Sequence, residues 1–163
     1  MPQLSLHTPL GDITLSEEEG AIVALDWGRG IHPDHPGWDR METPLLCEAR
    51  DRLQDYFDGR PVDFDLPLAP QGTPFQRRVW EALRHIPPGE TRSYAEIARE
   101  VGCRAARAIG RANGANPIPI LIPCHRVVAA DGSLGGYSGA DGPATKRYLL
   151  DLERRARQQG TPR

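Results

Sequence analysis

The sequence has few cysteines and no long apolar run. Its 163 residues include three cysteines at wide spacings and no C-x-x-C pair, which argues against a zinc site or a dithiol redox centre. No stretch reaches the roughly 18 consecutive apolar residues that a membrane helix needs. The first residues lack a basic segment followed by an apolar one, so we expect no secretory signal, no membrane association and a cytoplasmic location.

The three thiols differ in their surroundings. Cys47 lies among apolar residues at helical spacing, so we interpret it as a packed spectator, and Cys103 lies in a short polar turn with no histidine beside it. Only Cys124, in PILIPCHRVV, is followed directly by a histidine and an arginine. Because a thiol must lose its proton to become a good nucleophile, Cys124 and His125 are the candidate reactive pair.

The geometry of an extended chain sets a condition on this pair. Neighbouring side chains of an extended segment point to opposite faces, so His125 reaches the Cys124 sulfur only through a bridging water or a local turn. The histidine would also need a carboxylate to orient it, which would complete a set of cysteine, histidine and acid. From these residues alone, simple packing of CHR in an apolar core is the alternative interpretation.

Charge is divided unequally along the chain. Residues 1–70 carry five arginines and 14 acidic residues, a net charge of −9, whereas residues 71–163 carry 15 basic and eight acidic residues, a net charge of +7. A basic half indicates an anionic partner such as nucleic acid, with the acidic half turned away from it. Mutual attraction between two oppositely charged lobes is the alternative.

The hydrophobic pattern predicts two lobes, residues 1–70 and residues 71–163. The first begins with three alternating runs that predict a strand meander, at residues 4–7, 13–15 and 21–27. A helix ending near Phe57 should follow, because Thr43 and Pro44 form a typical N-cap and first helical position. After it, the alternation in VDFDLPLA predicts one more strand.

The second lobe is predicted to be mainly helical and to contain a helix-turn-helix. TPFQRRVWEALRHI, TRSYAEIAREV (residues 91–101) and AARAIGRAN have helical patterning, and a short turn containing Gly102 joins the last two. Arg104, Arg107 and Arg111 are spaced by three and four residues and therefore share one helical face. Given the charge division, we interpret this face as a phosphate-contacting surface; a solvated face is the alternative.

These segments together resemble one known family. NPIPILIPCHRVVAADGSLGGYSG is similar, almost position for position, to the active-site segment of the O6-alkylguanine-DNA alkyltransferases, also called methylated-DNA–protein-cysteine methyltransferases. The similarity includes GTPFQRRVWEALRHIPPGETRSYAEIA, AARAIGRAN and KRYLLDLE, with a looser match in TPLGDITL. It implies an α+β fold in which a small ribonuclease-H-like α/β lobe packs on a mainly helical lobe with a helix-turn-helix.

The resemblance also implies a reaction. The protein would repair O6-alkylguanine, with O4-alkylthymine as a further candidate substrate, by moving the alkyl group to Cys124 in a single turnover. His125 would act as general base through water, Glu153 would orient it, and Tyr94 would donate a proton or hydrogen bond to the guanine. The partner would be double-stranded DNA, bound through the minor groove with the damaged base flipped out. No cofactor or metal is expected, and the protein is expected to act as a monomer.

The remaining expected site residues come from the same match. Arg107 would enter the base stack, Asn116 would tie together the turn before the cysteine segment, and Val127 would offer its carbonyl to the base. The DNA-contacting surface would consist of Arg104, Ala106, Arg107, Gly110 and Arg111. The substrate pocket would consist of Asn116, Val127, Tyr137, Ser138 and Lys146.

The sequence departs from the family's usual pattern in three places. The turn GCR is shorter than usual and lacks a proline, GADGPATK after Ser138 is longer than usual, and the zinc-binding cysteines of some relatives are missing. Two other functions stay open. One is a non-catalytic alkyltransferase-like protein that binds the lesion, although such proteins replace the acceptor cysteine. The other is a hydrolase with a Cys, His and Glu set, which would need an oxyanion hole and would turn over repeatedly.

Overall fold

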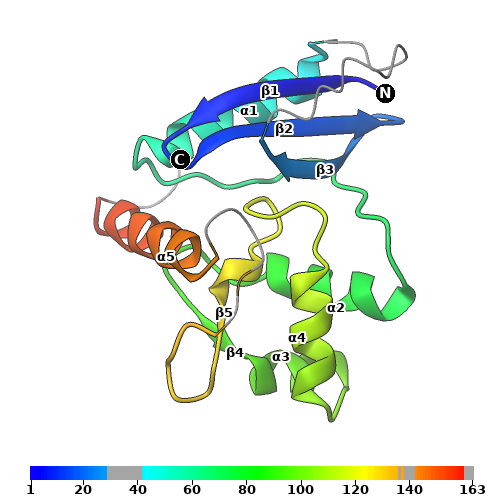
Figure 1. Cartoon of the computed structure of the whole chain (residues 1–163), viewed down its shortest axis with the longest axis vertical. Coiled ribbons are helices and arrows are strands. Elements are labelled where there is room, and N and C mark those ends of the chain that lie inside the picture. Colours follow the sequence, from blue (N-terminus) through cyan, green and yellow to red (C-terminus); the bar gives the residue numbers. More distant parts are fainter. Residues whose placement is uncertain (29–41, 136, 138–141, 160–163) are drawn as a thin grey trace.

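A small antiparallel sheet with one helix forms the N-terminal lobe, in the upper part of Figure 1. The computed structural model describes residues 1–28, 42–135, 137 and 142–159. The N-terminal elements are β1 (Gln3–Thr8), β2 (Gly11–Glu18), β3 (Ala21–Trp27) and α1 (Pro44–Phe57). The strand order is β1-β2-β3, and the register places Leu15 opposite both Leu4 and Leu25, so three leucines stack across one face. The predicted meander is confirmed.

Helix α1 begins where the sequence predicts it. The hydroxyl of Thr43 accepts a hydrogen bond from the amide of Leu46, and Pro44 occupies the first helical turn. Leu46 and Leu53 are fully buried on the face of the helix that packs against all three strands. The cap and the apolar spacing are both local signals, which explains why the sequence predicts this helix correctly.

The extra strand predicted in VDFDLPLA is wrong. Residues 60–67 have no regular structure, and the only bridge in this region joins Leu68 to Ile22 of β3. The guanidinium of Arg52 in α1 donates to the backbone carbonyls of Asp63 and Asp65. Because a side chain satisfies these carbonyls, the segment does not need a neighbouring strand.

The C-terminal lobe is mainly helical, as predicted. Its elements are α2 (Pro74–Arg84), β4 (Arg92–Ser93), α3 (Tyr94–Val101), α4 (Ala106–Gly114), the 3-10 helix η1 (Cys124–Arg126), β5 (Val127–Val128) and α5 (Pro143–Gln158). Helices α2, α3 and α4 pack on one another in the lower part of Figure 1, and the indole of Trp80 in α2 donates to the carbonyl of Ala112 in α4. In the described part of the chain, no helix has the length and apolar character needed to cross a bilayer.

Helix α3 begins at Tyr94 rather than Thr91. Ser93 is its N-cap and forms a capping box with Glu96, while Arg92 and Ser93 form the short strand β4, which pairs in parallel with β5. The prediction placed the start too early because the pairing partner, directly after the cysteine segment, is distant in the sequence. The pairing brings the first residue of α3, Tyr94, close to the strand that follows η1.

Replacing Thr73 by alanine should destabilise the protein by about 1 kcal/mol, because α2 loses its N-cap. The Thr73 hydroxyl accepts from the amide of Gln76, and the Gln76 side chain accepts from the amide of Thr73. Urea unfolding measures the change in the free energy of unfolding. Thr73→Asp keeps an acceptor oxygen and should differ from the parent by less than about 0.5 kcal/mol. Equal losses in the two variants would contradict the capping role.

Candidate active site

Cys124 begins a single turn of 3-10 helix. Pro123 precedes the turn, and the amide of Val127 closes it by donating to the carbonyl of Cys124. Cys124, His125 and Arg126 are all buried. The local turn that the Cys124 and His125 pair requires is therefore present, and the two side chains need not point to opposite faces as they would in an extended chain.

Two asparagines hold the segment that carries the thiol. Asn116 donates to the carbonyl of Ile122 at 2.8 Å and accepts from the amide of Ile118 at 2.9 Å, so it bridges both ends of the loop before Cys124. Asn113, on the buried face of α4, donates to the carbonyl of Cys124 at 3.1 Å. The position of the thiol is thus tied to the helix that carries the exposed arginines.

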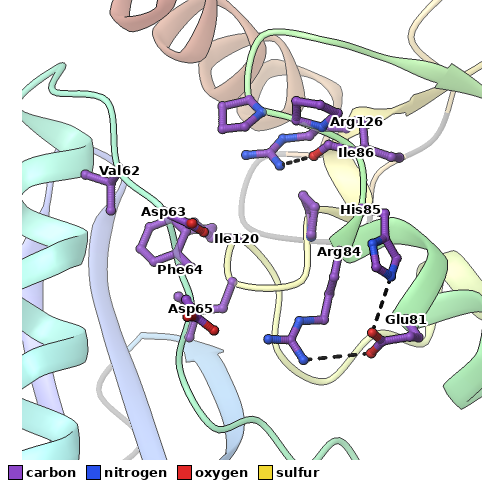
Figure 2. Close-up of a pocket in the computed structure, with 14 residues that line it drawn as sticks. Val62, Asp63, Phe64, Asp65, Glu81, Arg84, His85, Ile86, Ile120 and Arg126 are labelled. Carbon is purple, nitrogen blue, oxygen red and sulfur yellow. Dashed lines mark hydrogen bonds and ion pairs between the residues drawn. The ribbon is translucent and has the colours of Figure 1, made fainter. Parts of the chain in front are cut away.

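Glu153 is the centre of a buried hydrogen-bond network. Its Oε2 accepts from His125 Nε2 and from the Tyr56 hydroxyl, each at 2.7 Å. The guanidinium of Arg126 binds both carboxylate oxygens, at 2.9 Å through Nε and 2.8 Å through Nη2. Figure 2 shows the remaining arm of Arg126, whose Nη1 donates to the carbonyl of Ile86 at 2.6 Å. The carboxylate therefore joins residues from α1, η1 and α5.

Burial and neighbouring charges fix the protonation states of this network. Burial raises the pKa of the Glu153 carboxyl, but the charges and hydrogen bonds of His125 and Arg126 outweigh it and hold the pKa well below its ordinary value. Burial lowers the pKa of His125, partly offset by Glu153, so the imidazole is neutral at neutral pH. Because a carboxylate only accepts, the imidazole proton lies on Nε2. His125 Nδ1 has no hydrogen-bond partner in the described part of the chain and can accept a proton.

The thiol of Cys124 is protonated at rest. Burial raises its pKa, opposed in part by a hydrogen bond from Asn116 and by the charge of Lys146. Lys146 is the only lysine in the chain and is fully buried, and burial lowers its pKa to about 8 although the nearby Cys124 opposes this. A buried, protonated thiol with a neutral imidazole in the next residue is a nucleophile that depends on a base.

Two tyrosines lie near the thiol. Burial, and after it the proximity of Cys124, raise the pKa of Tyr94, so its hydroxyl is a hydrogen-bond donor at neutral pH. The Lys146 ammonium lies 5.9 Å from the centre of the Tyr94 ring. Burial also raises the pKa of Tyr137, which shares a cavity with Cys124. A Cβ atom added at Gly135 would lie 3.0 Å from the Tyr94 hydroxyl, so this segment approaches Tyr94 closely.

The cavity beside Cys124 has a volume of about 180 Å³ and walls from both lobes. Asp26 and Trp27 of β3 face it from the N-terminal lobe, and Pro119 and Tyr137 from the C-terminal lobe. A larger cavity of about 450 Å³ between the lobes is bordered by Arg126 but not by Cys124 (Figure 2). Residue chemistry rather than cavity size therefore identifies the site.

The predicted DNA-contacting residues lie on α4 and the turn before it. Arg104, Arg107 and Arg111 are exposed, and none of them forms an ion pair with another described residue. Ala106 is also exposed, and a Cβ atom added at Gly110 would lie 3.9 Å from the ring of Tyr94. This surface is therefore adjacent to the tyrosine beside the thiol.

The short turn before α4 has an unusual cap. Ala105 is the N-cap residue of α4 and supplies no side-chain hydrogen bond, but its amide donates to the Cys103 sulfur at 3.4 Å. Cys103 thus takes part of the capping role in a turn that lacks the usual proline. Val127 is fully buried in β5, opposite Arg92 of β4. Ser138 lies outside the described residues.

Sequence reasoning missed three residues of the network. Arg126 stands in the motif CHR and could have been found, because an arginine buried beside a histidine needs a carboxylate. Asn113 gave only the weaker signal of a polar residue on the apolar face of a helix. Tyr56 gave no signal, since it is separated from Glu153 by 97 residues and occupies an ordinary core position of α1.

Comparisons with known proteins agree with this geometry. The family model described as 6-O-methylguanine DNA methyltransferase, ribonuclease-like domain, matches residues 4–70, and that of the DNA binding domain matches residues 74–155. The chain is 45% identical over 157 residues to the constitutive methylated-DNA–protein-cysteine methyltransferase of Bacillus subtilis (strain 168), covering 91% of this chain and 92% of the relative. It is 47% identical over 150 residues to the methylated-DNA–protein-cysteine methyltransferase of Methanosarcina barkeri, covering 91% and 94%. The crystal structure of Mycobacterium tuberculosis OGT in complex with DNA matches with a TM-score of 0.83 and 41% identity, over 99% of this chain and 96% of that chain.

Glu153→Gln should destabilise the protein by about 3–5 kcal/mol, because it leaves the Arg126 guanidinium buried without a counter-charge. The folded-state pKa of Glu153 is lower than the unfolded one, so its contribution is complete above the ordinary glutamate pKa and is lost as the pH falls toward the folded value. The difference between parent and variant should therefore shrink below about pH 4.

Urea unfolding at neutral and acid pH measures this difference. Glu100→Gln makes the same chemical change at an exposed site and should stay within about 0.5 kcal/mol of the parent. A loss for Glu153→Gln that is the same at both pH values would show that the ionised carboxylate is not the source of the stability.

Proposed function

Since this chain belongs to the 6-O-methylguanine DNA methyltransferase family, we propose that it repairs O6-alkylguanine in duplex DNA by moving the alkyl group to Cys124. The observation that carries the proposal is the buried turn in which Cys124 precedes a neutral histidine, itself hydrogen-bonded to an ionised glutamate. It is a DNA repair enzyme, a methylated-DNA–protein-cysteine methyltransferase, and O4-alkylthymine is a further candidate substrate.

The chemical step is a single in-line displacement. The sulfur of Cys124 forms a bond to the alkyl carbon while the bond between that carbon and guanine O6 breaks, and the electron pair of the broken bond passes to the guanine. His125 takes the thiol proton through a water molecule at Nδ1, and Glu153 stabilises the resulting imidazolium through Nε2. Tyr94 donates to the departing guanine. The product is a thioether on Cys124, so each chain acts once.

The groups around the thiol support this step electrostatically. Lys146 favours the thiolate, because its charge opposes the rise that burial causes in the pKa of Cys124. We place the alkyl group of the substrate beside the Cys124 sulfur, at the cavity that Cys124 and Tyr137 line. In this proposal Tyr137 and Ser138 cover the base, and the Val127 carbonyl accepts a hydrogen bond from it. No cofactor or metal enters this scheme.

DNA is bound through α4 in our proposal. The exposed arginines Arg104 and Arg111 contact phosphates, and the small residues Ala106 and Gly110 let the helix backbone approach the minor groove closely. Arg107 enters the base stack and fills the space of the flipped-out nucleotide. In this proposal residues 71–163 bind DNA and carry the reacting groups, and residues 1–70 support the site from the opposite side. The protein acts as a monomer in the cytoplasm.

The two other functions are not favoured. The lesion-binding alternative requires a protein that has lost catalysis. This chain instead has Cys124, beside a base that can accept its proton. Relatives that are 44–47% identical over most of their length are methyltransferases, which argues against a hydrolase.

Incubation with a duplex containing one O6-methylguanine should add the mass of one methylene group to each chain. The gain should saturate at one per molecule, map to Cys124 and disappear in Cys124→Ala, while Cys103→Ala keeps it. Intact-protein and peptide mass spectrometry measure this outcome. An unchanged mass with the duplex still bound would favour the lesion-binding alternative, and release of more than one product per chain would favour a hydrolase.

Arg107→Ala should slow transfer from duplex DNA by about tenfold or more, because the extruded base is no longer replaced in the stack. Its reaction with a free O6-alkylguanine base should match that of the parent. Arg104→Ala and Arg111→Ala should instead weaken binding to all sequences and reduce the salt slope by about one each. Quenched time courses of alkyl transfer, and binding titrations at several salt concentrations, distinguish intercalation from phosphate contact. Equal slowing of Arg107→Ala on duplex and free base would contradict the intercalating role.

A further inference from the structure

Tyr56 connects the N-terminal lobe to the carboxylate of the active-site network. It lies in the last turn of α1 and is 4% exposed. Its hydroxyl donates to Glu153 Oε2 at 2.7 Å, and His125 Nε2 lies at the same distance from the same oxygen. A side chain of the N-terminal lobe and the candidate general base therefore share one acceptor atom.

We propose that Tyr56 is a positioning residue for alkyl transfer, which fixes the Glu153 carboxylate and thereby sets the orientation and basicity of His125. The inference rests on the proposed function, since it gives His125 the role of general base. It assigns the N-terminal lobe a direct part in the reaction, through one hydroxyl group that never touches the substrate.

The position of the Tyr56 ring is itself fixed. The rings of Phe57 and Phe64 lie 5.3 and 5.4 Å from it, centre to centre. Burial and the neighbouring Glu153 raise the pKa of Tyr56 well above its ordinary value, so the hydroxyl keeps its proton at any pH at which the protein works. Tyr56 is therefore a permanent donor to Glu153.

Two neighbouring clefts lie next to the hydrogen bond between Tyr56 and Glu153. A cavity of about 430 Å³ is lined by Tyr56 and Glu153, and the cavity of Figure 2, about 450 Å³, is bordered by Arg126. Pro87 and Pro88 line both cavities. Clefts border the network where the lobes meet, so the hydrogen bond from Tyr56 to Glu153 supplements packing in fixing α1 relative to α5.

The charged groups near His125 determine in which direction its pKa should change when the Tyr56 hydroxyl is removed. Glu153 and Lys146 of α5 and Arg126 of its own turn act on the imidazole, and Tyr56 acts on it through the carboxylate. Without the Tyr56 hydroxyl, fewer hydrogen bonds stabilise the Glu153 carboxylate, and its charge interacts more strongly with His125. The imidazolium form is then stabilised, and the pKa of His125 should rise.

Tyr56→Phe removes only the hydroxyl group and is the test variant. At saturating duplex, its single-turnover rate constant should be about 3- to 10-fold lower at neutral pH, with unchanged affinity for DNA. The acid limb of its pH profile should move to higher pH by about half a unit. Tyr148→Phe makes the same chemical change at a half-buried tyrosine of α5 whose hydroxyl forms no hydrogen bond with another described residue, and it should keep the rate constant and the acid limb of the parent.

An NMR titration of the His125 imidazole, without DNA, measures the same change independently of transfer. A higher His125 pKa in Tyr56→Phe than in the parent is the expected result. The same pKa and the same acid limb in both proteins would overturn the inference. A parent that transfers no alkyl group would overturn the proposed function instead, and the NMR titration would still decide whether Tyr56 sets the basicity of His125.

Discussion

Glu153 carries a carboxylate charge where only 2% of the residue is exposed, and the surrounding donors compensate for the lost water. Arg126 supplies two of the four hydrogen bonds and the counter-charge, so the carboxylate stays ionised rather than taking up a proton. An ionised carboxylate can hold the Nε2 proton of a neutral imidazole, which leaves Nδ1 to act as a base. Replacing a whole buried ion pair by apolar residues often costs little stability, whereas removing one partner is costly, and this pair also fixes which groups are charged around the thiol.

The same carboxylate also determines how distant parts of the chain are arranged. Its partners come from α1 and η1, and Arg126 extends the network to the carbonyl of Ile86 just beyond α2. Asn113 continues it to α4 through the carbonyl of Cys124. The helix that presents arginines to solvent is therefore linked by hydrogen bonds to the thiol, and the thiol's neighbours to the N-terminal lobe. A shift of either lobe would change the geometry of the reacting groups.

Local signals predicted what is local, and missed what depends on distant partners. The caps at Thr43 and Thr73 and the apolar spacing that follows each of them predicted α1 and α2 well. The start of α3 was misplaced because β4 needs β5, and the extra strand was wrong because Arg52 satisfies its carbonyls. At the site, the residues themselves indicated Cys124 and His125, and the family resemblance added Glu153 as the carboxylate. No pattern indicated Tyr56, because its partner becomes a neighbour only when both lobes have folded.

In the part of the chain that the structure describes, the acidic N-terminal half and the basic C-terminal half are not joined by ion pairs. If the opposite charges served to attract the two lobes to each other, ion pairs should cross between the lobes. Among the described residues every ion pair joins two residues of the same lobe. The hydrogen bonds that cross between the lobes come from the Tyr56 hydroxyl, from the amide of Leu25 to the carbonyl of Pro117, and from Arg84 to the carbonyl of Leu66. The exposed arginines of α4 thus keep their charge for another partner. Because an acidic lobe repels the phosphate backbone, the field of the whole protein favours the orientation that we propose, in which α4 meets DNA first.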